Sequence, residues 1–272
     1  MTTNEVVRPI DVESVRAQYR RARPYPFFVI DDFLERDFVR DVVAEYPRFD
    51  QATSMGRHFD RLNETGKVQI TETSFFGPSV RRLNEALASR TFLDTLSEIT
   101  GTPDLLADSK LHGGGMHITR RSGRLDVHAD FNWLEDQNLY RRFNILVYLN
   151  PVWDPAWGGG LELWDAEVTR REFYCLPKLN RCLVFETTKT SFHGVEKVAC
   201  PPDQQRQSFA AYYYTKAPPP GWDGTHWSTI FRARPDEQVR GRVLMPAERA
   251  IEGAKKLAGR VRGRLDKLRG RA

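Results

Sequence analysis

The sequence contains little cysteine and no long apolar run. Its three cysteines, Cys175, Cys182 and Cys200, include no C-x-x-C pair. This odd number and this spacing argue against a disulfide framework or a structural zinc site. No stretch approaches the roughly 20 apolar residues of a membrane-spanning helix, and residues 1–16 lack the apolar core of a secretory signal. We therefore expect a cytoplasmic protein with reduced thiols.

The composition is otherwise that of a globular protein, with 40% hydrophobic and 28% charged residues. A length of 272 residues allows one large β-rich domain with additions, or two small domains. The net charge of +5 is uneven, because residues 232–272 hold thirteen Lys and Arg against five Asp and Glu. The preceding residues are therefore mildly acidic, and we expect no nucleic-acid partner.

This basic segment predicts a separate unit. We expect a jelly-roll domain with an N-terminal helical layer over residues 1–231 and a basic helical extension over residues 232–272. From Pro246 onward, a stripe of apolar residues at helical spacing has Arg and Lys on the other faces: Leu257, Val261, Leu265 and Leu268. Such a helix is typical of peripheral membrane contact, and equally of docking on the body or pairing in a dimer.

The N-terminal part predicts helices around one buried strand. Asp11 is a candidate N-cap for the first helix, and Pro47 ends the second. The polar residues 50–70 show no periodicity and predict a long loop, of the kind that covers a site. The expected helices and strand are 11–22, 27–30 (the strand), 32–47, 78–88 and 91–99.

From Ala107 to Thr215 short β-prone segments alternate with turn signals. The expected strands are 106–112, 116–121, 125–130, 142–149, 161–164, 168–176, 182–186, 194–198 and 207–215. Gly158–Gly160 lacks a following helix with Lys and Ser or Thr, so it predicts a tight turn and not a phosphate loop. Many short strands at this spacing predict a mainly β fold with flanking helices, a jelly roll of two facing sheets.

One stretch, VHADFNW from Val127 to Trp133, holds the chemistry-bearing pair His128 and Asp130. Alternate residues of a β-strand point to the same face, so an extended stretch puts the imidazole beside the carboxylate. These are two of the three ligands in the 2-His-1-carboxylate triad of non-haem Fe(II) oxygenases. His193 begins a predicted strand and is the candidate third ligand.

Farther along, the run RQSFAAYYYT places Arg206 and Ser208 on one face of the last predicted strand. A guanidinium beside an iron site can grip a carboxylate through two parallel hydrogen bonds. In this chemistry that carboxylate is the distal one of 2-oxoglutarate. The hydroxyl of Tyr148, on the strand before the glycine-rich turn, can add another hydrogen bond.

Six motifs in order give the sequence a family resemblance over roughly residues 25–216. They are PFFVIDDFL, GGGMHITRRSGRLDVHADFNW, RRFNILVYLNPVW, GGGLELWD, NRCLVFETTKTSFHGV and RQSFAAYYYT. The sequence resembles a bacterial Fe(II)/2-oxoglutarate-dependent dioxygenase of the prolyl-4-hydroxylase-like branch. The resemblance implies a double-stranded β-helix and the cofactors Fe(II), 2-oxoglutarate and O2, with ascorbate as a candidate reductant.

The resemblance also implies roles for single residues. His128, Asp130 and His193 would be the iron ligands, Arg206 would bind 2-oxoglutarate, and Tyr148 would assist it. Halogenating relatives leave the carboxylate position empty, so Asp130 favours hydroxylation, with release of succinate and CO2. We expect hydroxylation of an unactivated C–H of a small-molecule or glycan-related substrate.

Alternatives remain for the activity and the substrate residues. A prolyl or peptidyl hydroxylase acting on a protein and a non-catalytic jelly-roll module are the other readings. A nucleic-acid demethylase is disfavoured, since position 212 lacks the second arginine of that group. The candidate substrate residues are His117, Asn132, Arg141 and Arg142. A structural role for His117 and a solvated strand edge for the two arginines are equally consistent with the sequence.

Overall fold

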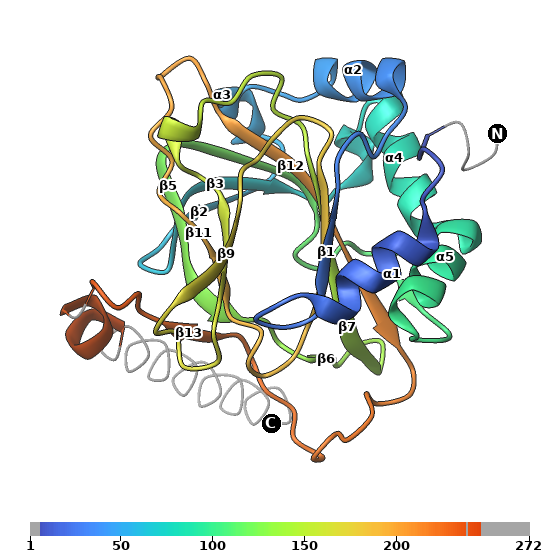
Figure 1. Ribbon diagram of the computed structural model, residues 1–272. Helices are drawn as coiled ribbons and strands as arrows, with labels where there is room; N and C mark the ends of the chain where they lie inside the picture. The colour runs from blue at the N-terminus through green and yellow to red at the C-terminus, as the bar shows by residue number, and fades with distance from the viewer. Residues whose placement is uncertain (1–5, 238, 246–272) are drawn as a thin grey trace, which may run out of the picture.

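A curled antiparallel sheet forms the centre of the computed structural model, which describes residues 6–237 and 239–245 (Figure 1). Its main path runs in the order β1-β10-β7-β12-β5-β11-β8-β9. The strands of this path are β1 (Phe27–Ile30), β5 (Gly115–Ala129), β7 (Leu139–Tyr148), β8 (Leu161–Trp164), β9 (Arg171–Cys175), β10 (Cys182–Glu186), β11 (His193–Val195) and β12 (Arg206–Thr215). The strands beside it are β2 (Arg57–Asp60), β3 (Glu64–Ile70), β4 (Leu106–Ala107), β6 (Trp133–Leu134) and β13 (Ile230–Arg232).

The long strand β5 joins the two halves of this sheet. Its first part pairs with β12, and its second part pairs with β11. Between them Ser122 has a φ of 67°, where the chain turns from one half to the other. The sequence predicts two strands here, because the polar residues between them interrupt the apolar pattern. The predicted mainly β fold with flanking helices, a double-stranded β-helix, is confirmed.

Helices cover one face of the sheet, as Figure 1 shows for α1, α4 and α5. The helices are α1 (Val12–Arg21), α2 (Arg36–Ala44), α3 (Phe49–Ala52), α4 (Pro78–Ala88) and α5 (Arg90–Thr100), with 3-10 turns at Thr73–Phe75 and Pro155–Trp157 and a π turn at Arg240–Leu244. The Asp11 side chain accepts a hydrogen bond from the Ser14 backbone, the N-cap interaction that the sequence predicts. The largest hydrophobic core lies between these helices and the outer face of β7, β10 and β12.

The prediction of a long loop over residues 50–70 is wrong. These residues form α3 and the hairpin of β2 and β3, and β3 pairs along β5. The reason is that the pattern is short: in β3 only Val68 and Ile70 are apolar, and they alternate with the polar Lys67 and Gln69 over four residues. Four residues are the lower limit at which alternation indicates a strand.

The residues after β12 return to the body of the protein. β13 adds to β5, with Phe231 opposite His128. Farther on, Arg234 pairs with the buried carboxylate of Glu162 at 2.6 Å, and Arg240 pairs with the buried Asp126 at 2.8 Å. The division between residues 1–231 and 232–272 stays a proposal. The helix expected after Pro246 lies outside the described residues.

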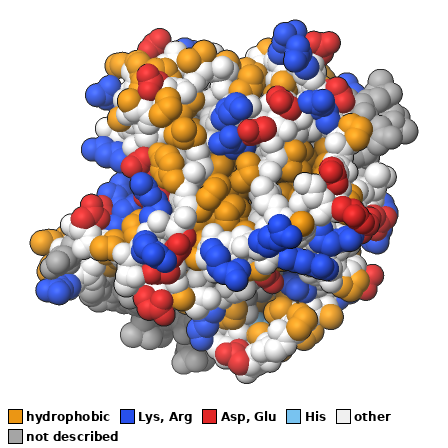
Figure 2. All heavy atoms as spheres, viewed as in Figure 1, with side chains coloured by type: hydrophobic (Ala, Val, Ile, Leu, Met, Phe, Trp, Pro, Cys, Tyr) orange, Lys and Arg blue, Asp and Glu red, His pale blue; other side chains and the backbone are white. Residues whose placement is uncertain are grey.

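Charges of both signs lie side by side on the face shown in Figure 2, around hydrophobic side chains near its centre. No described helix has the length and apolar character needed to cross a membrane.

The ion pair of Arg234 and Glu162 gives a stability prediction. The side chains of Arg234 and Glu162 are 11% and 3% exposed, and Arg171 also contacts Glu162 at 3.2 Å. We expect Arg234→Ala to lower the free energy of unfolding by about 2–4 kcal/mol, because it leaves a buried carboxylate with one partner fewer. Urea denaturation measures this, with the exposed Arg170→Ala as control. Equal midpoints for the two variants would show that the pair does not stabilise the fold.

Candidate metal centre and adjoining cavity

Three potential metal ligands converge where β5 and β11 lie side by side. His128 on β5 is directly opposite His193 on β11, and Asp130 follows β5 by one residue. Their ligand atoms lie within 4.8 Å of one another. His128 and His193 are buried, and the Asp130 side chain is 13% exposed. Each Nε2 is 3.5 Å from one oxygen of Asp130. With metal–ligand bonds of about 2.1 Å, neighbouring ligands of one ion lie about 3 Å apart, so the donor set fits a divalent metal.

Backbone carbonyls fix how the two imidazoles are oriented. The Nδ1 of His128 lies 2.9 Å from the Asp126 carbonyl oxygen, and the Nδ1 of His193 lies 3.0 Å from that of Ser191. Since a carbonyl oxygen only accepts, each Nδ1 carries the proton and each Nε2 presents its lone pair to the centre. A metal-binding histidine is typically held in this way.

The protonation states also suit a metal. Burial, with the neighbouring His128, lowers the pKa of His193 to about 3, so its imidazole is neutral at pH 7. Burial opposes the charge on Asp130, but the Arg141 guanidinium and the two imidazoles hold the pKa of its carboxyl well below the usual value. The centre therefore presents a neutral His193 imidazole and an ionised Asp130 carboxylate.

Two side chains from β7 hold the Asp130 carboxylate. The Arg141 guanidinium lies 3.0 Å from Oδ2, and the Asn144 amide donates to the same oxygen at 2.7 Å. Arg141 also donates to the side-chain Oδ1 of Asn144 at 2.9 Å, and its guanidinium lies 3.6 Å from the centre of the Tyr212 ring. These contacts fix Asp130 and occupy Arg141, which is 2% exposed.

A cavity of about 70 Å³ adjoins the three ligands inside the barrel. Strand register places polar side chains along it in rows. In one row Thr119 on β5 has Lys67 on one side and Arg206 on the other. In the next row Ser208 on β12 lies between His117 and Tyr148. The row of Lys67, Thr119 and Arg206 gives this end of the cavity two cationic groups, of which Lys67 is paired with the partly buried Glu64 at 2.8 Å.

Three buried polar atoms on neighbouring strand positions form no hydrogen bond of good geometry among the described residues. They are Nη2 of Arg206, the hydroxyl of Tyr148 and the hydroxyl of Ser208. Of the three side chains, Arg206 lines the cavity, and Tyr148 and Ser208 lie in the row beside it. Arg206 is 3% exposed, and Tyr148 and Ser208 are fully buried. Nε of Arg206 donates to the carbonyl of Gly159 in the glycine turn at 2.7 Å, and the guanidinium lies 5.2 Å from the centre of the Tyr148 ring. Buried polar groups are nearly always hydrogen-bonded, so this trio suits an oxygen-rich anion.

The other predicted substrate residues lie in different surroundings. His117 lines the cavity, with its Nε2 3.0 Å from the Gly113 carbonyl. Asn132 instead holds a later segment, accepting from the Trp227 backbone at 2.9 Å and donating to the Thr225 carbonyl at 3.1 Å. Arg142 lines a second, larger cavity. The four predicted substrate residues, with Arg141 paired to Asp130, therefore do not line one common site.

Sequence reasoning missed Lys67, Thr119 and Asn144. Asn144 had a signal, because it shares a strand face with Tyr148 in the run NILVY. Thr119 lies two residues from His117 on a predicted strand and could have been found in the same way. No sequence pattern marks Lys67 as a site residue, because it falls in the segment predicted to be a loop.

Comparisons with known proteins support this geometry. Residues 114–214 match the family described as the 2OG-Fe(II) oxygenase superfamily. No curated protein matches the chain. Among solved structures, a Pseudomonas putida prolyl-4-hydroxylase is similar, with a TM-score of 0.52 and 16% identity over 74% of this chain and 98% of that one. Prolyl 4-hydroxylases from Phytophthora capsici give 0.52 and 17% over 80% of this chain and 72% of that one.

A third structure, the epimerase SnoN in complex with Fe3+, alpha ketoglutarate and nogalamycin RO, gives a TM-score of 0.51. Its identity is 14%, over 82% of this chain and 94% of that one. At these identities the structures establish a shared fold. The family match covers β5 to β12, the strands that carry all three ligands and Arg206. The resemblance that the sequence motifs indicate is confirmed.

Proposed function

The chain carries a domain of the 2OG-Fe(II) oxygenase superfamily, and from that premise we propose that it hydroxylates an unactivated C–H of a small-molecule or glycan-related substrate. It is an enzyme that depends on Fe(II) and 2-oxoglutarate. When bound, these supply the oxidising power, with O2 as oxidant and succinate and CO2 as products. The chain's own residues bind, orient and shield the reactants.

In this proposal His128, Asp130 and His193 hold Fe(II) on one face. Their carbonyl, Arg141 and Asn144 contacts keep the donor atoms aimed at one point before the metal arrives. Protein ligands on one side leave the other side of the ion to co-substrate and O2.

The unpartnered atoms of Arg206, Tyr148 and Ser208 carry the co-substrate assignment. We assign the distal carboxylate of 2-oxoglutarate to them, since a carboxylate accepts from a guanidinium and from two hydroxyls at once. Binding would satisfy three buried donors that otherwise cost stability. Lys67, on the row of Arg206, adds a second positive charge.

Lys67 gives a prediction that separates this assignment from a general charge effect. We expect Lys67→Met to raise the KM for 2-oxoglutarate about tenfold, because a hydrogen bond or ion pair to a charged group contributes about 1.5 kcal/mol. The matched control is Lys178→Met, a residue whose side chain is 62% exposed and pairs with Asp31 on the surface. Steady-state succinate assays measure both. The same KM in both variants would remove Lys67 from the co-substrate site.

Isotope labelling tests the reaction itself. Under ¹⁸O2, an Fe(II)- and 2-oxoglutarate-dependent hydroxylase puts one labelled oxygen atom into succinate and the other into the hydroxylated product. We expect labelled succinate from the wild type even in slow turnover without substrate. A small-molecule panel and a proline-containing peptide panel, compared for stimulated succinate release, separate the two substrate classes. Wild-type protein that releases no labelled succinate with iron and 2-oxoglutarate would contradict the proposal.

A further inference from the structure

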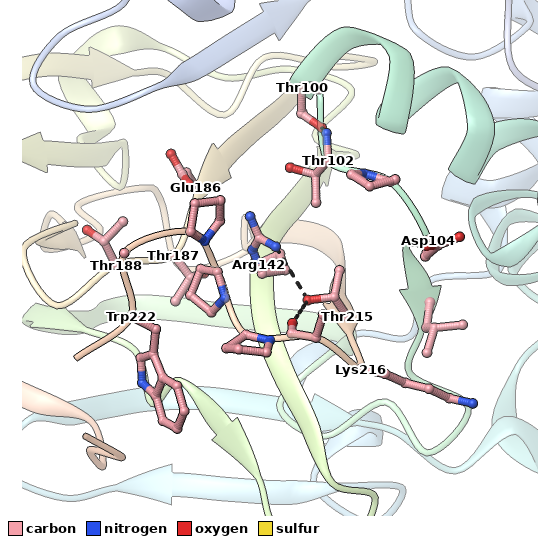
Figure 3. Close-up of a pocket in the computed structure, with 18 of the residues that line it drawn as sticks. Thr100, Thr102, Asp104, Arg142, Glu186, Thr187, Thr188, Thr215, Lys216 and Trp222 are labelled. Atoms are coloured by element: carbon pink, nitrogen blue, oxygen red, sulfur yellow. Dashed lines mark hydrogen bonds between the residues drawn. The ribbon is translucent and has the colours of Figure 1, made fainter. Parts of the chain in front are cut away.

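A second cavity of about 1000 Å³ lies beside the metal centre. It is lined by the ends of β10 and β12, the start of β7, the end of α5, and the segment 216–227 that follows β12 (Figure 3). This volume is at the upper end of the range for sites that bury a drug-sized ligand. The cavity is therefore large enough for the part of a substrate that does not react.

The same strands line both cavities. β10 contributes Phe185 to the metal cavity and Glu186 to the larger one, and β7 contributes Asn144 and Arg142 in the same way. The hydroxyl of Thr187, on the wall of the larger cavity, donates to the side-chain Oδ1 of Asn144 at 3.3 Å. The two cavities are thus lined by neighbouring positions of the same two strands, β7 and β10.

A tryptophan makes a second link. Trp227 lines the larger cavity, and its indole nitrogen donates to the backbone carbonyl of the ligand residue Asp130 at 2.9 Å. A ligand in the larger cavity would therefore lie one side chain away from the metal centre.

Two charged side chains of this cavity, Arg142 and Glu186, make few hydrogen bonds within the protein. Arg142 is 7% exposed, yet its guanidinium has one long hydrogen bond among the described residues, to the Thr215 hydroxyl at 3.4 Å (Figure 3). Glu186 lies on the same wall with the Tyr19 hydroxyl at 3.5 Å. The charges of Arg142 and Glu186 interact, but no ion pair within 4 Å joins them in the described part of the chain, so each keeps hydrogen-bonding capacity for a ligand.

Threonines and a tryptophan make up much of the remaining lining. The threonines come from three separate segments: Thr100 and Thr102, Thr187 and Thr188, and Thr215. The hydroxyls of Thr100, Thr187 and Thr215 donate within the protein and keep oxygen lone pairs that can accept from a ligand. Trp222 uses its indole nitrogen on the Thr225 carbonyl and packs edge-on to Tyr140 at 4.9 Å. The ring also contacts His226 at 5.1 Å, and Trp222 lines the cavity (Figure 3). The other charged lining residues are of both signs: Arg90, Asp104, Lys189, Lys216 and Asp223.

From this lining we infer that the cavity receives an uncharged, hydroxyl-rich ring, a saccharide unit of the substrate. The inference rests on the proposed function and names its substrate class. Neighbouring hydroxyls donate to Glu186 and accept from Arg142, while the C–H face of the ring packs on Trp222. A phosphate would require clustered cations, and this lining mixes both signs.

Ligand binding tests the inference without any turnover. The probes are methyl α-glucopyranoside, methyl α-mannopyranoside, N-acetylglucosamine and maltotriose, followed by saturation-transfer NMR with the full-length protein. We expect at least one of them to bind the wild type. Arg142→Gln, Glu186→Gln and Trp222→Ala should each weaken that binding about tenfold or more. Arg40→Gln, an exposed arginine on α2, should leave it unchanged.

Two results would overturn the inference. One is binding of no saccharide probe by a wild type that still binds 2-oxoglutarate. The other is saccharide binding that survives in all three cavity variants, each checked for native circular dichroism. The proposed function fails by a different observation, the absence of 2-oxoglutarate binding by iron-loaded wild type. The two failures are therefore distinguishable in the same protein preparations.

Discussion

Asp130→Ala should abolish 2-oxoglutarate turnover and weaken Fe(II) binding by more than about 100-fold. Losing a residue that only supports a metal ligand already costs about 10- to 100-fold in affinity, so loss of the ligand itself should exceed that. The change also leaves Arg141 without its carboxylate partner. Asp130→Asn, which keeps the shape of the side chain, is therefore the companion variant. Metal content after anaerobic dialysis and succinate release measure the two effects.

The matched control is Asp37→Ala, whose carboxylate is 93% exposed on α2. His128→Ala and His193→Ala should behave like Asp130→Ala, since the three donor atoms surround one point. A folded Asp130 variant with wild-type metal affinity would mean that the metal binds elsewhere.

Arg206→Ala should raise the KM for 2-oxoglutarate by about 10²–10³ while leaving Fe(II) affinity unchanged. Two hydrogen bonds to a charged group together contribute about 3–4 kcal/mol, and 1.4 kcal/mol corresponds to a factor of ten. Arg206→Lys should recover little of this, because an ammonium cannot reproduce the planar fork of a guanidinium. The Nε contact to Gly159 fixes the direction of that fork.

The measurement is the 2-oxoglutarate dependence of succinate release, with iron content determined on the same samples. Arg170→Ala, an exposed arginine on the turn before β9, is the control. An unchanged KM in Arg206→Ala would show that another group binds the co-substrate.

How far the sequence predicts the structure depends on where the apolar pattern is strong. Strands such as Leu161–Trp164 and Cys182–Glu186 are buried runs between clear turns, and the structure has them at those bounds. β3 is missed because its apolar face consists of Val68 and Ile70 alone. An alternating pattern of four residues, flanked by polar residues, does not stand out as a strand.

The pair Arg141 and Arg142 shows a second limit. The sequence makes both of them candidate substrate residues. The register between β7 and β12 shifts at this point, and the two neighbours have separate roles. Arg141 is paired with Asp130, while Arg142 faces the larger cavity. A sequence does not reveal such a shift, because it depends on the partner strand.

The larger cavity could not be predicted from the sequence at all. Its walls come from segments as far apart as Tyr19 and Trp227. None of them carries a motif, and they meet only in the folded chain. The metal ligands differ in this respect, because H-x-D on a strand is a local pattern with a geometric meaning.

The most direct test is anaerobic titration of the Fe(II)-loaded protein with 2-oxoglutarate, followed by the visible charge-transfer band of the chelated co-substrate. The account predicts a saturable band in the wild type, no band in Asp130→Ala, and a band in Arg206→Ala only at much higher 2-oxoglutarate. A wild-type protein that binds Fe(II) but develops no band at any concentration of 2-oxoglutarate would contradict it.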